Sequence, residues 1–363
     1  MTKVLILGSG NIGSVVAKLL QKSGDYMVTL ASRNKEQLHT ASKNDSLITL
    51  HLNIHSDELL SLFQKYQIII SALPFYENTA IAQTALEAGV SYFDLTEDRK
   101  TTKSILSIAR KAKEGQVFMP QCGLAPGAIG IIGHGLSQSF ETIREIKMRV
   151  GALPLYPSNK LKYNLSWSTQ GLINEYCNPC QILYNGEVTE VLPLEGLEHF
   201  TLDGLEYEAF NTSGGLGHLS ETLQGKAQHL SYKSIRYKGH RDLIHFLLHD
   251  LDFIHDQKEL EKLLERNLPK TKQDVVLLYI TITGLIDGSF QQRSYTKKIY
   301  HNGDYTAIEI TTAHGLCAAV DLFVSKQLPQ KGFIYQEQID LNWFFNNRFG
   351  KLYEKSFNGD EHV

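Results

Sequence analysis

The sequence predicts an α/β protein: a doubly wound parallel sheet comes first, and an α+β region on a mostly antiparallel sheet follows. Two observations carry this prediction. The first 125 residues alternate short apolar runs with stretches of helical apolar spacing, which is typical of repeated strand–helix–strand units. From about Gly135 onward, strand-like stretches come in pairs around turn residues, which favours hairpins.

Each element of the first part follows from its own pattern. Short apolar runs separated by helical segments are expected as parallel strands. These runs are Val4–Leu7, Met27–Ala31, Leu47–Leu52, Ile68–Ala72, Tyr92–Leu95 and Val117–Pro120. Segments between them carry apolar residues at i, i+3 and i+4, so we expect helices over Ile12–Lys22, Asp57–Lys65, Thr79–Ala88 and Ile105–Glu114.

The second part follows from its turns. Asn185-Gly186, Asp203-Gly204 and Asn302-Gly303-Asp304 are turn signals. They predict antiparallel ribbons over Gln181–Leu192, Phe200–Phe210 and Val275–Ile286 with Ser294–Ile310, interrupted by helices at Arg241–Leu251 and Lys258–Arg266. Beyond Thr311 we expect a helix over about Gly315–Lys326, a short strand and a final helix that pack back on the first domain. The predicted domains are therefore 1–125, 126–312 and 313–363.

Composition narrows the class of protein. Of 363 residues, 42% are hydrophobic and 21% charged, as in an ordinary globular protein, and a formal net charge of -3 argues against a nucleic-acid partner. Met1 leads directly into a strand without a signal-peptide pattern, and no apolar run approaches the roughly 20 residues that span a bilayer. Four cysteines are too few for a disulfide scaffold. We expect a cytoplasmic enzyme with no membrane partner.

The chain opens with a dinucleotide-binding pattern, G-x-G-x-x-G. Gly8 permits the tight turn after the first strand, Gly10 lets the backbone approach a pyrophosphate, and Gly13 lets helix and sheet pack closely. The helix beginning near Asn11 and Ile12 offers free N–H groups to the phosphates. The strand-to-helix context predicts a Rossmann domain.

The end of the second strand indicates which dinucleotide binds. NAD-selective sites place a carboxylate there for the ribose 2′-OH. This chain has Ser32 and Arg33 instead, and an arginine can pair with a 2′-phosphate. We therefore expect NADP, with NAD possible as a second cofactor. Ala72, Leu73 and Pro74, at the end of the fourth strand, are expected to line the same cofactor.

Several segments resemble the saccharopine dehydrogenase family. They are "SALPFYENTAIAQTALEAGVSYFDLTED" (71–98), "CGLAPGAIGIIGHGL" (122–136), "RVGALP" (149–154), "YNLSWSTQGLINEY" (163–176), "FNTSGGLGHLSETL" (210–223) and "IRYKGHRDLI" (235–244). In length and in the motifs of the second part, the chain is most similar to the lysine 6-dehydrogenase branch. Its Ser32-Arg33 pair departs from that branch, which carries an acidic residue there, and is more like NADP-using saccharopine enzymes.

The resemblance implies an oxidoreductase that acts on a carbon–nitrogen bond of an amino acid, in lysine metabolism, and that forms a homodimer. Lysine 6-dehydrogenation is the leading expectation. A glutamate-forming, NADP-dependent saccharopine dehydrogenase and a carboxynorspermidine dehydrogenase-like reductase are alternatives, and a second basic residue (Lys160, Lys162 or Arg241) would favour saccharopine. An alternative of another class is a catalytically silent NADP-binding sensor.

The chemistry requires a base for the substrate amine. "FDLTED" ends a parallel strand, where ligands of α/β proteins bind, so Asp94 and Glu97 are candidate catalytic residues and Thr96 a candidate substrate contact. Asp98 could equally open the next helix. Cys122 ends another strand near the expected nicotinamide, although a buried thiol is the simpler interpretation because hydride transfer needs no nucleophile.

Candidates for substrate binding come from the second part. Arg236 is expected to pair with the substrate carboxylate, with His240 as a second candidate. Trp167 could line the aliphatic chain of the substrate, and a glycine-rich loop with Gly214, Gly215, Gly217 and His218 could enclose it. The Cys177–Cys180 pair lacks the second C-x-x-C of a zinc site, and the scattered histidines show no ligand spacing, so we expect no metal.

Overall fold

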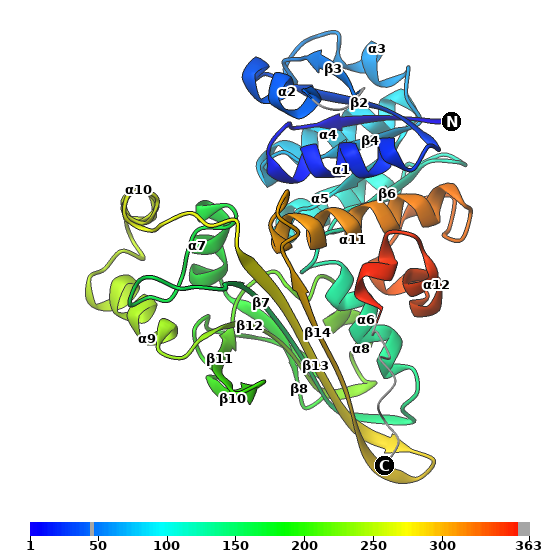
Figure 1. The fold of residues 1–363 in the computed structure, drawn as a ribbon. Helices are drawn as coiled ribbons and strands as arrows, with labels where there is room; N and C mark the ends of the chain where they lie inside the picture. Colours follow the sequence, from blue (N-terminus) through cyan, green and yellow to red (C-terminus); the bar gives the residue numbers. More distant parts are fainter. Residues whose placement is uncertain (44–46, 355–363) are drawn as a thin grey trace. The chain divides into compact units, whose positions relative to one another are not determined.

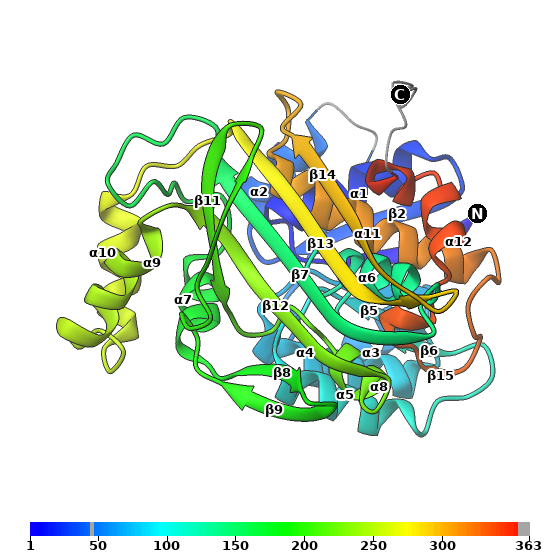
Figure 2. The ribbon, with the colours of Figure 1, turned by 90° about the horizontal axis from the view of Figure 1, so that it is seen from below.

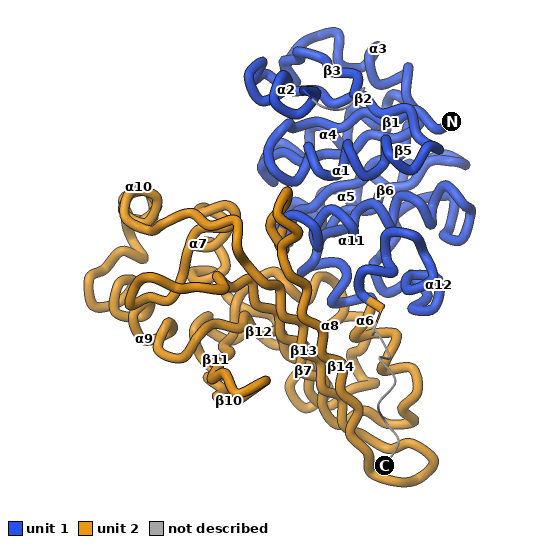
Figure 3. Tube along the Cα trace, in the orientation of Figure 1, with its two compact units in different colours: residues 1–131, 309–353 blue, residues 132–308, 354–363 orange. Residues whose placement is uncertain are grey.

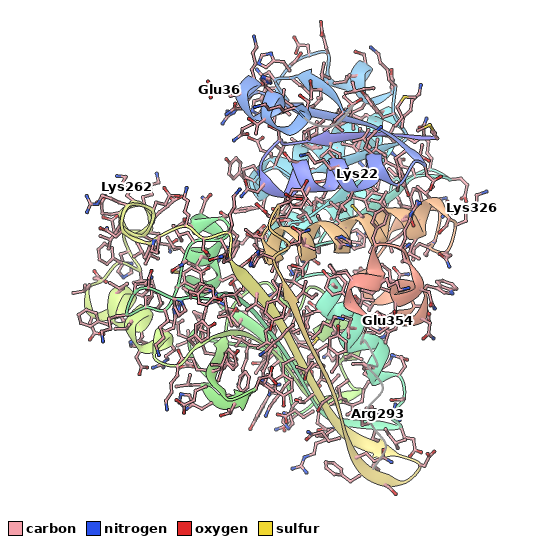
Figure 4. All side chains as sticks on the ribbon, viewed as in Figure 1. Lys22, Glu36, Lys262, Arg293, Lys326 and Glu354 are labelled. Carbon is pink, nitrogen blue, oxygen red and sulfur yellow. The ribbon has the colours of Figure 1, made fainter. Side chains whose placement is uncertain are left out.

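The structure is a computed structural model that describes residues 1–43 and 47–354. The chain divides into two compact units (Figure 3): among the described residues, unit 1 is Met1–Ile131 with Glu309–Tyr353, and unit 2 is Ile132–Ile308 with Glu354. Both boundaries, 131/132 and 308/309, fall inside helices, whereas the sequence placed the first at 125/126, before its helix, and the second at 312/313, four residues further into the same helix. Charged side chains occupy the outside of each unit, as the labelled Glu36 and Lys262 show (Figure 4).

Unit 1 contains a seven-stranded parallel sheet (Figure 1) in the order β15-β6-β5-β4-β1-β2-β3. The strands are β1 (Thr2–Leu7), β2 (Tyr26–Ser32), β3 (Ile48–His51), β4 (Ile68–Ser71), β5 (Ser91–Asp94), β6 (Val117–Met119) and β15 (Gly332–Phe333). The order reverses between β1 and β4, the position at which ligands of doubly wound sheets bind. The Rossmann prediction is confirmed.

The helices of unit 1 cover both faces of this sheet. Leu5, Ile69 and Tyr92 pack with α3, α4 and α5 on one face, while Phe93 on the other face lies 5.7 Å, centroid to centroid, from Phe323 of α11. The helices are α1 (Asn11–Lys22), α2 (Lys35–Ser42), α3 (Leu59–Phe63), α4 (Phe75–Ala88), α5 (Arg99–Ala109), α6 (Ala128–Ser137, which runs into unit 2), α11 (Ala307–Val324) and α12 (Leu341–Asn346). Because β15 pairs with β6, the C-terminal tail belongs to this sheet.

Helix α11 has the composition of a membrane span. Its 18 residues have a mean hydropathy of 1.4, and it is the one such helix among residues 1–43 and 47–354. Two thirds of it, 67%, is buried inside the protein, as in a core helix. Gly315 explains how closely it packs in unit 1, since a Cβ there would lie 2.6 Å from the Gly123 carbonyl oxygen.

Unit 2 is built on a mixed, mostly antiparallel sheet, as expected. Its main path is β10-β11-β12-β7-β13-β14, with β8 and β9 joined at β12, and Figure 2 shows its long strands side by side. The strands are β7 (Thr142–Pro154), β8 (Cys180–Tyr184), β9 (Glu187–Val191), β10 (Glu198–Leu202), β11 (Leu205–Asn211), β12 (Ala227–Tyr237), β13 (Asp274–Ile286) and β14 (Ser289–Tyr300). The helices are α7 (Thr169–Cys177), α8 (Leu219–Leu223), α9 (His240–His245), a π-helical turn (Phe246–Asp250) and α10 (Gln257–Asn267).

One predicted hairpin is wrong in its turn. The strand expected over Ser294–Ile310 is β14, which ends at Tyr300, and the turn that joins it to β13 is Asp287-Gly288, both with positive φ. Asn302 instead accepts backbone hydrogen bonds from Asp304 and Tyr305 in the link to α11. An Asx turn and a hairpin turn share the same residue types, so the sequence pattern did not separate them.

Candidate functional site

The glycine turn of unit 1 has the geometry that a pyrophosphate needs. A Cβ at Gly8 would lie 2.7 Å from the Ala72 carbonyl oxygen, and a Cβ at Gly13 would lie 2.0 Å from the Gly8 oxygen. By contrast, a Cβ at Gly10 would meet nothing within 4 Å. Gly10 is the N-cap of α1. No side chain of the described residues caps the first-turn N–H groups, and a phosphate can accept their hydrogen bonds.

Arg33 supplies the positive charge expected for a 2′-phosphate. It is exposed at the end of β2, and its guanidinium has no partner among the described residues. Ser32 precedes it, and its hydroxyl accepts a hydrogen bond from the Asn34 backbone. Asn34 caps α2 by accepting from Gln37, so a second helix N-terminus lies beside the arginine. These residues fit NADP, which when bound supplies hydride-transfer chemistry.

Asp94 holds structure together rather than facing a ligand. Its carboxylate is 0% exposed and accepts hydrogen bonds from the Tyr92 hydroxyl (2.8 Å) and from the backbone N–H groups of Thr96 (2.9 Å) and Gln121 (3.1 Å). Burial raises the pKa of Asp94 to about 6, against the lowering effect of these hydrogen bonds. The carboxylate ties the end of β5 to the segment after β6. Thr96 belongs to the same turn, and its hydroxyl accepts from the Asp98 backbone.

Glu97 is the free carboxylate at this strand end. No hydrogen bond to another residue engages its side chain among the described residues, and it is half-buried. Burial, with the neighbouring charge of Asp98, raises its pKa. Asp98 is the N-cap of α5, accepting from the Thr101 backbone at 2.7 Å, so the structural interpretation holds for that residue. Of the three acids, Glu97 has the environment of a general base.

Cys122 has the environment of a structural thiol. It is buried, its Sγ donates toward the Met119 carbonyl at 3.1 Å, and burial raises its pKa well above the ordinary value. A neutral, donating thiol is a poor nucleophile, so the geometry gives Cys122 no catalytic part. The Gly-Leu-Ala-Pro-Gly turn follows it and contains a cis bond before Pro126.

In unit 2, Arg236 of β12 is buried among aromatic rings. It is 3% exposed, and its guanidinium carbon lies 5.2 Å from the Tyr163 ring centroid and 5.7 Å from that of Tyr176. Among the described residues no carboxylate forms an ion pair with it. Burial lowers its pKa, but Tyr176, Tyr163 and Glu175 outweigh this effect, so the net pKa is raised and the charge is kept. A buried cation without an acidic partner is the environment of an anion-binding residue.

Trp167 and Tyr163 form one wall of this cluster. The Trp167 indole donates to the Tyr163 hydroxyl at 3.0 Å, and the two side chains belong to the same hydrophobic core. Trp167 also covers Gly171 of α7, where a Cβ would lie 2.6 Å from its ring. Trp167 therefore packs against α7, as a core tryptophan does.

The glycine-rich loop approaches a side chain of its own unit. A Cβ at Gly215 would lie 2.2 Å from the Tyr232 ring, and Gly214 and Gly217 have positive φ. The loop is joined to α7 because Ser213 donates to the Asn174 and Glu175 carbonyls. His218 is the partly buried N-cap residue of α8, and its Nδ1 lies 3.2 Å from the Thr222 hydroxyl in the same helix. The predicted close approach exists, but its partner is a tyrosine of β12.

His240 is unsuited to bind a carboxylate. It is 1% exposed, and burial together with the charge of Arg236 lowers its pKa to about 3, so it is neutral at physiological pH. Both ring nitrogens are engaged: Nε2 lies 3.0 Å from the Tyr176 hydroxyl and Nδ1 lies 2.9 Å from the Leu161 carbonyl. These contacts do not favour His240 as a second carboxylate-binding residue.

Tyr163 and Tyr176 surround Arg236, and the sequence did not indicate either as a site residue. Both belong to the family motif "YNLSWSTQGLINEY", but neither shows a charge or a spacing that points to Arg236.

Cys177 and Cys180 are free thiols whose pKa values burial raises to about 11 and about 12. In the described ranges, no three His, Cys, Asp or Glu side chains come together as they would around a metal.

The glycine turn, the parallel sheet and the free arginine define a protein of the NADP-binding Rossmann class with a second, α+β unit. Residues 4–119 match the saccharopine dehydrogenase NADP binding domain, and residues 123–355 match the saccharopine dehydrogenase C-terminal domain. The chain belongs to the saccharopine dehydrogenase family, and its cofactor is NADP. The predicted family and cofactor are confirmed.

Relatives support the same assignment. The chain is 26% identical over 263 residues to mitochondrial alpha-aminoadipic semialdehyde synthase of Mus musculus, covering 66% of this chain but only 27% of that protein. It is 23% identical over 275 residues to saccharopine dehydrogenase [NADP(+), L-glutamate-forming] of Pyricularia oryzae, covering 70% and 59%. It is 31% identical over 159 residues to carboxyaminopropylagmatine dehydrogenase of Synechocystis, covering 39% and 40%.

The fold agrees with one solved structure in particular. Apo saccharopine dehydrogenase (L-Glu forming) from Saccharomyces cerevisiae superposes with a TM-score of 0.79 at 16% identity, covering 94% of this chain and 95% of that one. At this identity the similarity establishes the fold.

Proposed function

We propose that this protein is an NADP-dependent oxidoreductase that acts on the carbon–nitrogen bond of an amino acid, in the manner of a lysine 6-dehydrogenase. One observation carries the proposal: Arg236 is a buried guanidinium without an acidic partner in the described residues, in a chain of an NADP-binding family. A guanidinium in that state favours a ligand carboxylate through charge-assisted hydrogen bonds.

The number of available cations favours a substrate with one anchored carboxylate. The other basic residues considered for a second carboxylate are occupied or exposed. Arg241 donates to the Leu194 carbonyl and to Asp242, Lys162 donates to the Lys238 carbonyl, and Lys160 is exposed. An amino acid such as lysine needs one carboxylate partner at the end remote from the reacting amine.

Saccharopine is the second candidate substrate, because a curated relative is named as an NADP-dependent, L-glutamate-forming saccharopine dehydrogenase. That substrate carries a glutarate arm on the nitrogen and needs further cations. A carboxylated polyamine imine is a more distant alternative, supported by the Synechocystis relative named as a carboxyaminopropylagmatine dehydrogenase.

The residues of this chain contribute substrate binding and proton transfer to the reaction. The glycine turn and Arg33 would hold NADP, which would supply hydride-transfer chemistry at the carbon that bears the amine. The amine must first be neutral, so a base removes its proton. Glu97 is the candidate because no other described residue hydrogen-bonds to its carboxylate and burial raises its pKa. Arg236 holds the carboxylate. Hydrolysis of the resulting imine by water would release ammonia and leave an aldehyde on the carbon that bore the amine.

A panel assay tests the proposal. The purified protein is mixed with NADP or NAD and with lysine, saccharopine, ornithine or carboxynorspermidine, and the absorbance of the reduced nicotinamide is followed. We expect turnover of lysine with NADP. Turnover of saccharopine alone moves the assignment to the second candidate, and NADP binding without any turnover favours the sensor. The homodimer implied by the family resemblance stays a prediction.

A further inference from the structure

Tyr176 lies between Arg236 and His240 in unit 2. Its hydroxyl oxygen is 2.9 Å from Nε of Arg236 and 3.0 Å from Nε2 of His240. The other imidazole nitrogen, Nδ1, is 2.9 Å from the Leu161 carbonyl oxygen. All three side chains are buried, with exposed fractions of 2% (Tyr176), 3% (Arg236) and 1% (His240). The four groups form one chain of hydrogen bonds.

The ends of this chain determine the direction of every bond in it. A guanidinium only donates and a carbonyl oxygen only accepts. His240 must therefore carry its proton on Nδ1, facing Leu161. Arg236 donates to the Tyr176 oxygen, so the single hydroxyl proton is free to go to Nε2 of His240, which accepts. The alternative, a doubly protonated imidazolium, would bury a second positive charge beside Arg236.

This chain of hydrogen bonds engages one side of the Arg236 guanidinium, and the N–H groups on the other side remain without a partner in the described residues. Of its five N–H groups, Nε–H goes to Tyr176 and one Nη1–H goes to the Ile235 carbonyl at 2.9 Å. One N–H on Nη1 and two on Nη2 remain. Nη2 has no hydrogen bond to another described residue and is not among the fully enclosed side-chain atoms without a partner, so part of its surface is exposed.

We propose that Tyr176 and His240 are positioning residues that hold the Arg236 guanidinium in one orientation, with its Nη1–Nη2 edge presented end-on to the substrate carboxylate. This inference rests on the proposed function, in which Arg236 binds that carboxylate. Neither residue needs to touch the substrate. Each acts through the next: Leu161 orients the imidazole, the imidazole orients the hydroxyl, and the hydroxyl fixes Nε.

The physical benefit is pre-organisation. A long arginine side chain loses several rotatable bonds when it binds a ligand, and a guanidinium already locked by packing and hydrogen bonds loses less. The rings of Tyr163 and Tyr176 lie 5.2 and 5.7 Å from the guanidinium carbon and restrict it further. The Tyr163 ring also packs against His240, at 5.4 Å between centroids. Tyr176 and His240 therefore fix the orientation of the Arg236 guanidinium and add no charge of their own.

The kinetic test compares four variants with L-lysine, and with cadaverine as the analogue that lacks the carboxylate. Tyr176→Phe and His240→Leu should raise KM for lysine about tenfold or more, with kcat changed less than about threefold, because each removes a hydrogen bond that orients a charged group. His240→Gln keeps an acceptor for the Tyr176 hydroxyl and should restore KM to within about threefold. Tyr237→Phe is the matched control.

Tyr237 suits that purpose because it neighbours Arg236 on β12 and its hydroxyl donates to the Pro154 carbonyl at 2.9 Å. Its loss should lower the melting temperature without changing KM for lysine. Neither Tyr176→Phe nor His240→Leu, which interrupt the hydrogen-bond relay from Leu161 through His240 and Tyr176 to Arg236, should change KM for NADP or the kinetics with cadaverine. If His240→Gln is as impaired as His240→Leu, or if KM for cadaverine rises together with that for lysine, the positioning role is overturned.

A second measurement needs no turnover and so separates this inference from the proposed function. Long-range proton–nitrogen NMR of the protein labelled with ¹⁵N-histidine, assigned by the signals lost in His240→Gln, reports which nitrogen of His240 is protonated. We expect a protonated Nδ1 and an unprotonated Nε2 throughout the neutral pH range. A protonated Nε2 overturns the relay. If Arg236→Ala leaves KM for lysine unchanged while the NMR result holds, the proposed function fails and the relay stands as a structural feature.

Discussion

The guanidinium carbon of Arg236 lies 5.2 Å from the centroid of the Tyr163 ring, and no carboxylate of the described residues forms an ion pair with that arginine. A cation–π contact contributes roughly 0.5–2 kcal/mol, which is less than the cost of burying the charge. The arginine is thus retained at a cost to stability, as is common where a charge is needed for a ligand.

Replacing this arginine should separate binding from folding. Arg236→Ala should raise KM for the amino-acid substrate by about 100-fold, because a bidentate charge-assisted pair is lost. Its melting temperature should stay the same or rise. Arg293→Ala, at an exposed arginine of β14, is the control and should behave as the wild type. A KM unchanged in Arg236→Ala would contradict the carboxylate role.

Gly10→Ala should weaken NADP binding without weakening the fold. A Cβ at Gly10 meets nothing within 4 Å and its φ of -67° suits any residue, so the melting temperature should change little. The added methyl would enter the space that the pyrophosphate needs, and Kd for NADP should rise about tenfold or more. Gly13→Ala, whose Cβ would lie 2.0 Å from the Gly8 oxygen, should lose stability as well. Unchanged NADP affinity in Gly10→Ala would place the pyrophosphate elsewhere.

Arg33→Asp should invert the cofactor preference. The substitution removes the unpaired guanidinium and adds a charge that repels the 2′-phosphate, so kcat/KM with NADP should fall on the order of 100-fold. The value with NAD should hold or rise, because a carboxylate can accept from the ribose hydroxyl. Steady-state kinetics with both cofactors measures the ratio. If both values fall equally, Arg33 contributes to the fold and not to cofactor selection.

Glu97→Gln should lower kcat by about 100-fold or more, because the amide cannot accept a proton. The raised pKa of Glu97 sets the sign of the pH dependence. The active form is the carboxylate, so kcat of the wild type should rise as pH increases through that pKa. This rising limb of the pH–kcat profile should be absent in Glu97→Gln. Asp98→Asn, which keeps the cap of α5, should retain the limb. A limb that persists in Glu97→Gln identifies another base.

Asp94→Asn should alter stability and leave catalysis nearly intact. The pKa of Asp94 is raised to about 6 in the folded protein, above its unfolded value, so the folded state binds the extra proton. The wild type should therefore be most stable below the unfolded pKa and lose on the order of 2–3 kcal/mol as pH rises through about 6. The amide does not titrate, and its melting temperature should be flat over that range. A 100-fold fall in kcat would instead make Asp94 the base.

Two strands at the centre of the unit 2 sheet were not predicted from the sequence. β7 and β12 form the parallel pair at the centre of its sheet, yet neither was predicted as a strand. A parallel pair is joined by a long crossover and leaves no turn signal between its strands. The β8–β9 and β10–β11 hairpins were predicted because their turn residues, Asn185-Gly186 and Asp203-Gly204, lie directly between the paired strands.

Site residues were likewise identified where neighbouring sequence defines them, and were not distinguished where their roles depend on tertiary contacts. Gly8, Gly10, Gly13 and Arg33 were identified because a cofactor-binding turn is encoded within some thirty neighbouring residues. Asp94 and Glu97 were identified together but not distinguished. Their difference depends on the Tyr92 hydroxyl and the Gln121 backbone, which reach Asp94 and leave Glu97 free.

The sequence by itself determined the α/β class, the NADP-binding turn and the family, because glycine spacing, apolar period and charge are local properties of the chain. Only the tertiary structure decided that Arg236 lies between Tyr163 and Tyr176 without an ion pair to a carboxylate of the described residues, and that His240 is neutral and engaged at both nitrogens. Leu161 and His240 are 79 positions apart in the chain. Contacts of that kind depend on how strands and helices pack, and burial and hydrogen-bond direction follow from the packing.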